Sequence, residues 1–104
     1  MKLSEAIAGW PKPLCRVMWW CKLDSGRIAV CPLTAAALAA GLFTEEFLLQ
    51  KDSQSTSKKV EQLRDIMISY WPFLLNRHKE IIDKWDTTEC TRDELISWLQ
   101  NIGL

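Results

Sequence analysis

The sequence predicts a small, mainly α-helical domain of four to five short helices with a minor β-hairpin near residues 16–31. Two patterns indicate this class. Apolar residues recur at spacings of three and four in the second half, and two runs of strand-forming residues flank a glycine turn in the first half. The 104 residues are enough for one hydrophobic core. We therefore expect a single domain over residues 1–104.

Short helices are expected on both sides of the hairpin. Ser4 can cap a first helix, which Gly9 and two following prolines would end. A second helix is expected over residues 33–40, with Gly41 in the left-handed conformation just after its end. Thr44 can cap a third helix, whose first two residues are acidic and suit the positive end of the helix dipole.

The hairpin is expected to consist of strands at residues 16–23 and 27–31. Asp24-Ser25-Gly26 between them is typical of a turn. An isolated two-stranded hairpin is only marginally stable, so its apolar face must pack on helices. Alternation along the first strand places four side chains on that face: Val17, Trp19, Cys21 and Leu23.

The second half begins with an exposed polar loop at residues 51–59. Beyond it, three apolar stripes predict three helices. The third helix begins with Thr91-Arg92-Asp93-Glu94, in which the side chains of Thr91 and Glu94 can accept hydrogen bonds from one another's backbone N–H groups. The stripes are Val60, Leu63, Ile66, Met67 and Tyr70; then Leu74, His78, Ile81, Ile82 and Trp85; then Leu95, Trp98, Leu99 and Ile102.

Compartment signals indicate a cytoplasmic protein that does not enter a membrane. Glu5 stands where an export signal needs its apolar run. The longest uncharged stretch, residues 28–44, is interrupted by Pro32 and Gly41 and is too short to cross a bilayer. In this compartment the four cysteines are expected to be reduced thiols.

The sequence contains no recognisable catalytic or metal-binding motif, so no catalytic residue, cofactor or metal site is predicted. The cysteines at 15, 21, 31 and 90 form no C-x-x-C pair, which leaves zinc as an unsupported alternative. His78 lies on an apolar stripe and is expected to bond a backbone group; an enzyme would need it beside Asp83 or Asp86. Residues 83–94 fail the pattern of a calcium-binding loop.

Six tryptophans are the unusual feature of the composition. Burying most of them would contribute strongly to the core. Trp19 and Trp20 are adjacent, so in a strand their indoles point to opposite faces. We therefore expect Trp20, with Met18, to be exposed or to contact a partner or a second copy of the chain. The leading hypothesis is a non-enzymatic protein-interaction or self-associating module that uses an aromatic surface at Met18, Trp19 and Trp20.

A nucleic-acid-associated regulator is the alternative hypothesis. Residues 33–50 have the pattern of a helix-turn-helix, and three lysines follow it: Lys51, Lys58 and Lys59. The balance of 13 basic and 13 acidic residues gives no overall attraction to phosphates. The second helix would moreover present Glu45 and Glu46 to them, which is repulsive. Nucleic acid is therefore the disfavoured partner.

Three segments resemble a group of small proteins from bacteria and prophages. They are the start MKLSEAI, the segment CPLTAAALAAG at residues 31–41, and the closing run TRDELISWL from Thr91. Two positions depart from the group's pattern, because Cys90 stands where a tryptophan is usual and Asp86 lacks a preceding asparagine. The resemblance implies a bacterial or phage cytoplasmic setting, and it carries over no activity and no catalytic residue.

Overall fold

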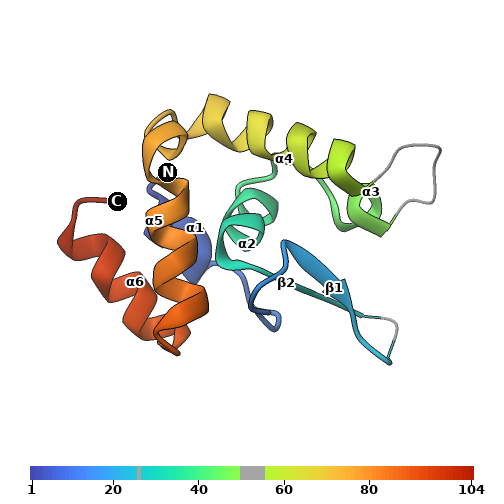
Figure 1. The fold of residues 1–104 in the computed structure, drawn as a ribbon, viewed down its shortest axis with the longest axis horizontal. Coiled ribbons are helices and arrows are strands. Elements are labelled where there is room, and N and C mark those ends of the chain that lie inside the picture. Colours follow the sequence, from blue (N-terminus) through green and yellow to red (C-terminus); the bar gives the residue numbers. More distant parts are fainter. Residues whose placement is uncertain (26, 50–55) are drawn as a thin grey trace.

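A computed structural model describes residues 1–25, 27–49 and 56–104 (Figure 1). These residues form six helices and one antiparallel hairpin, so the expected class is confirmed, with one helix more than the upper number expected. The elements are α1 (Leu3–Ala8), β1 (Trp20–Lys22), β2 (Ile28–Val30), α2 (Pro32–Ala39), α3 (Glu45–Leu49), α4 (Thr56–Tyr70), α5 (Leu74–Thr87) and α6 (Arg92–Asn101).

Helix α2 lies at the centre of the fold, packed against α1 and α5 (Figure 1). Its small side chains at positions 35–37 are fully buried, which lets neighbouring backbones approach closely. Gly41 ends it at φ +75°, as predicted. The N–H of Leu42 donates to the Ala37 carbonyl (3.0 Å) and that of Gly41 to the Leu38 carbonyl (3.1 Å), which satisfies two terminal carbonyls.

The expected cap of the first helix was wrong. Lys2 occupies the capping position of α1 and makes no side-chain capping bond, whereas Ser4 is buried inside the helix. The Ser4 backbone N–H instead donates to the carbonyl of Leu104 (3.1 Å). A long-range contact between the two chain ends therefore replaces the local cap, and α1 packs on α6.

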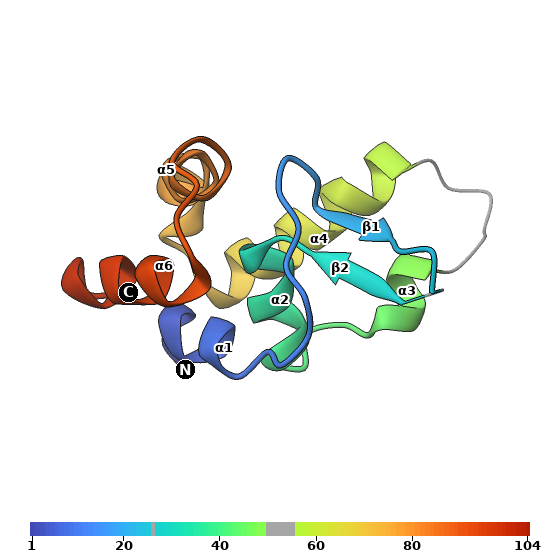
Figure 2. The same cartoon turned by 90° about the horizontal axis from the view of Figure 1, so that it is seen from below.

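The hairpin is shorter than expected. Only Trp20–Lys22 and Ile28–Val30 pair, in the register Trp20 with Val30 and Lys22 with Ile28. Residues 16–19 are not a strand, because they turn away toward α5 (Figure 2). The other edge of β2 bonds the segment before this turn, with the Cys15 N–H donating to the Val30 carbonyl (2.8 Å). β2 therefore has backbone partners on both edges, and all three of its residues are buried.

In the second half the helices follow the predicted stripes, except that Tyr70 at the end of the first stripe is 42% exposed. Helix α4 begins at Thr56, so the part of the expected 51–59 loop from residue 56 onward is helical; residues 51–55 lie outside the described residues. Helix α6 has the predicted capping box: the Glu94 N–H donates to the Thr91 hydroxyl (3.1 Å) and the Thr91 N–H to the Glu94 carboxylate (3.2 Å).

Burial of the tryptophans is less complete than expected. Trp10, Trp71 and Trp85 are buried in the core, and the other three are half-buried. The core itself draws on every helix and on β2. Within the described residues, no helix has both the length and the apolar character to cross a membrane.

Candidate interaction surface

The turn at residues 16–19 is fixed to the end of α5 by reciprocal contacts. The Arg16 guanidinium lies 3.8 Å from the centre of the Trp85 ring and donates to the carbonyls of Trp85 and Cys90. In return, the Trp85 indole N–H donates to the Cys15 carbonyl (2.8 Å). The turn therefore has a defined position on the helix.

Val17 stands at the tip of this turn in a conformation that β-branched residues rarely adopt. Its φ is +70°, and its N–H donates to the Asp86 carboxylate at 3.0 Å. Its side chain is 80% exposed, and that of Met18 is 54% exposed. Two adjacent apolar side chains are thus held in solvent by a strained backbone, an arrangement that is typical of functional sites.

On one side of the turn lies the α5 hollow, a small depression of about 50 Å³ between the turn, the start of α2 and the last turns of α5. Ile81, Ile82 and Trp85 form its α5 wall. Asp86 is the one charged residue among those that line it. An apolar depression with a single carboxylate suits an apolar side chain accompanied by a positive group.

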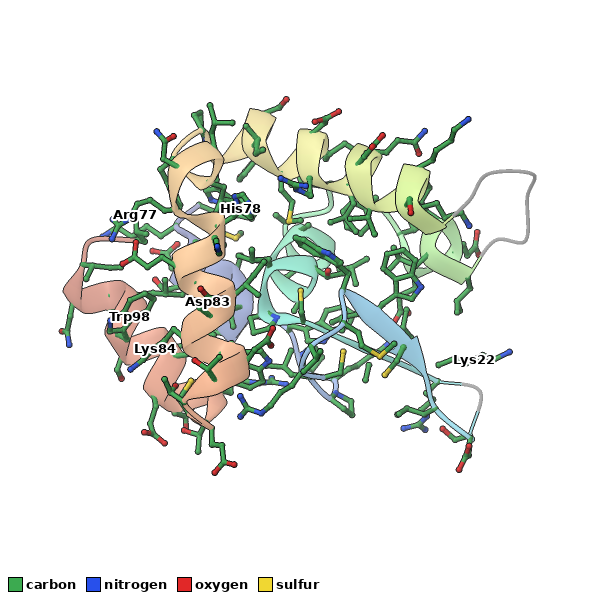
Figure 3. The ribbon with its side chains drawn as sticks, in the orientation of Figure 1. Lys22, Arg77, His78, Asp83, Lys84 and Trp98 are labelled. Carbon is green, nitrogen blue, oxygen red and sulfur yellow. The ribbon has the colours of Figure 1, made fainter. Side chains whose placement is uncertain are left out.

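On the other side lies the hairpin hollow, a larger depression of about 430 Å³ that is more open to solvent. It lies between the turn, β1, α3 and α4, and Leu49 and Val60 form its far wall. Among the residues that the structure describes, Lys22 is the one charged residue that lines it. In Figure 3, Lys22 extends away from the hairpin into solvent. Among the described residues it has no hydrogen-bond or ion-pair partner.

Val17, Met18 and Trp19 line both hollows, so the two depressions and the turn form one surface. We call it the docking surface; it comprises Val17, Met18, Trp19, Trp20 and Ile82 with Asp86 at one end and Lys22 at the other. The sequence-predicted residues Met18, Trp19 and Trp20 all lie on it. Met18 is exposed as expected, whereas both indoles are half-buried, so Trp20 is less exposed than we expected.

Four residues of this surface were not predicted from the sequence: Val17, Lys22, Ile82 and Asp86. From the sequence, Asp86 was considered only as the carboxylate that an enzyme would need beside His78. Val17 was expected to face the helices in a strand. The positions of Val17 and Asp86 on this surface depend on contacts between residues 69 positions apart, and no local sequence pattern predicts such contacts.

The lysines of the nucleic-acid alternative do not form a common patch in the described residues. Lys59 is only 5% exposed, Lys58 is exposed, and Lys51 lies outside the described residues. The second helix of the supposed helix-turn-helix is α3, of which the structure describes five residues. A recognition helix needs more turns than this to reach several base edges.

His78 has the backbone bond that its position predicts. Its Nδ1 lies 2.9 Å from the Leu74 carbonyl oxygen, and its Nε2 lies 3.4 Å from an Arg64 nitrogen. Figure 3 shows His78 and Asp83 at different turns of α5. His78 lines a small separate depression with Arg64 and Leu74, whereas Asp86 lines the α5 hollow. The pairing that acid–base chemistry would need is therefore not seen among these described side chains.

All four cysteines are free, and two of their thiols have shifted pKa values. Burial, with the neighbouring Cys21 and Cys31 thiols, raises the pKa of Cys15 from 9.0 to about 12. Burial also raises the pKa of Cys31. Within the described ranges no group of three or more His, Cys, Asp or Glu side chains is arranged to hold a metal ion.

Comparisons with protein-family models, with curated proteins and with solved structures give no match.

Proposed function

We propose that this chain is a cytoplasmic, non-enzymatic protein-interaction module that holds a protein partner on the docking surface. The observation that carries the proposal is the exposure of Val17 and Met18 on a fixed, strained turn between two apolar hollows. Burial of such side chains by a partner would remove apolar area from water at no further cost in ordering the turn.

The composition of the docking surface also supports an interaction with a protein partner. Tryptophan and methionine are enriched where proteins bind one another, because both offer large apolar area, and the methionine side chain also adapts to irregular gaps. Charged side chains stand only at the two ends of this surface among its described residues. An apolar centre with a charged rim is the usual anatomy of an interface.

Site-specific photocrosslinking tests the proposal. A photoreactive amino acid replaces Met18 in one variant and Ser97, exposed on α6, in a control variant, and each is expressed in cells of the source organism. We expect crosslinked products larger than one 12.0 kDa chain from position 18 and none from position 97. Absence of products from position 18, or nuclease-sensitive products only, would overturn the proposal, and the second result would favour the nucleic-acid alternative.

A further inference from the structure

The two ends of the docking surface carry opposite charges. Asp86 lines the α5 hollow, Lys22 lines the hairpin hollow, and no other charged residue lines either depression in the described structure. Val17 and Met18 line both depressions and so form an apolar ridge between them, and the Asp86 carboxylate lies at the foot of this ridge, where it accepts the Val17 N–H (3.0 Å). The charge of the surface therefore changes sign from one end to the other: one end is acidic, the centre is apolar and the other end is basic.

A surface of this kind is complementary to a copy of itself that is turned through 180°. In a twofold pair, residue i of one chain contacts residue j of the other and the reverse contact forms as well. With the axis beside Met18, Asp86 of each chain faces Lys22 of the other, and the Val17 and Met18 side chains of both chains pack together at the centre. This one arrangement pairs the opposite charges and also buries the apolar side chains.

We infer that the occupant of the docking surface is a second copy of this chain, held in an antiparallel twofold dimer by the Met18 ridge and two Asp86–Lys22 ion pairs. This inference rests on the proposed function, since it names the partner of the same surface. The Met18 side chain is unbranched and can settle into the hollow that the copy presents beside it. Pairing also hides an apolar centre that a monomer leaves in water.

Charge exchange at Lys22 and Asp86 tests the arrangement. In Lys22→Glu, both ends of each chain are acidic; in Asp86→Lys, both ends are basic. Each variant alone should dimerise at least about tenfold more weakly than the wild type, because like charges then face each other twice. Mixed together, the two should form a heterodimer of near wild-type affinity, because every acidic end now meets a basic end.

Native mass spectrometry over a range of protein concentrations gives the readout, since the two variants differ in mass. Lys2→Glu is the matched control for Lys22→Glu, because Lys2 is exposed and lines neither hollow. It should leave dimerisation unchanged. Asp86→Asn controls for folding at that position, because its amide oxygen can still accept the Val17 N–H.

Several outcomes would overturn the dimer. A wild-type chain that stays monomeric at every concentration would do so, as would a dimer that Lys22→Glu weakens no more than Lys2→Glu. A mixture of the two charge variants that fails to pair, while Asp86→Asn still dimerises, would also exclude this arrangement. Crosslinks from position 18 to a different protein, with no product of twice 12.0 kDa, would remove the dimer and leave the proposed function standing.

Met18→Ala provides a second test that changes no charge. Removal of this side chain takes away the apolar centre, so the dimer should weaken by about tenfold or more. Leu75→Ala is the matched control, because Leu75 is also exposed, at 64%, but lines neither hollow. Equal effects of the two variants would contradict the central position of Met18.

Discussion

The guanidinium of Arg16 stacks on the ring of Trp85, although the two residues are 69 positions apart in the chain. The cation lies 3.8 Å from the ring centre, Arg16 donates to the Trp85 carbonyl, and the Trp85 indole donates to the carbonyl of Cys15. Trp85 belongs to the core, so this pair fixes the exposed turn to the hydrophobic core. The position of the docking surface therefore depends on core packing.

Arg16→Lys should lower the free energy of unfolding by about 1 to 3 kcal/mol. A lysine cannot reach the carbonyls of Trp85 and Cys90 at once, and one part-buried acceptor would lose its donor. Equilibrium unfolding in urea measures the effect. Arg27→Lys is the control, because the Arg27 side chain is exposed on the hairpin turn. Equal losses in both variants would show that the contact with α5 contributes nothing.

Val17→Gly should separate stability from association. Glycine adopts φ +70° without the strain that a β-branched residue suffers there, so the free energy of unfolding should rise by up to about 1 kcal/mol. The same change removes an exposed apolar side chain from the docking surface, so dimerisation should weaken. Urea unfolding and native mass spectrometry measure the two effects.

Glu89→Gly controls for relief of strain alone. Glu89 also has a positive φ, +52°, but it is not β-branched and lies on neither hollow. We expect a smaller gain in stability and unchanged dimerisation. A Val17→Gly variant that is less stable than the wild type would argue that the turn is held without strain.

Elements that rest on local chemistry could be predicted from the sequence. The capping box of α6 needs only Thr91 and Glu94, and Gly41 is the residue that the end of α2 requires. The periodic apolar stripes of α4, α5 and α6 are equally local. Each of these patterns involves residues within one or two helical turns, so neighbours in the sequence decide the structure.

The turn at residues 16–19 could not be predicted in the same way. Its residues have strand propensity, yet Arg16 and Val17 bond α5 instead of a strand partner. Ser4 illustrates the same limit, because a contact with Leu104 overrides its capping propensity. The opposite charges at the ends of the docking surface became visible only when folding brought Asp86 and Lys22 to either side of Met18.

Thr91→Ala should cost about 1 kcal/mol of folding stability, because the Glu94 N–H loses its acceptor at the start of α6. Thr44→Ala is a matched comparison. Thr44 caps the five-residue helix α3 with a longer bond of 3.4 Å from the Phe47 N–H, so its loss should cost less. Thermal or urea unfolding checks the order, and a larger effect at Thr44 would contradict it.

The thiols should differ in their reaction with iodoacetamide. Only the thiolate reacts, and the raised pKa of Cys15 and Cys31 keeps these two protonated at pH 8. We expect both to be alkylated more slowly in the folded chain than in urea, with the Cys15 rate still rising above about pH 10. Mass spectrometry of peptides assigns each site. Equal rates at Cys15 in folded and unfolded chains would refute the prediction.

The same shift predicts how stability depends on pH. Because the pKa of Cys15 is about 12 in the folded chain and 9.0 is its ordinary value, the folded state binds more protons than the unfolded state between these values. The contribution of the protonated thiol is therefore fully present below about pH 9 and is lost as the pH rises toward 12. Cys15→Ala should flatten the fall in urea stability above about pH 9, whereas an unchanged slope would assign that fall to other groups.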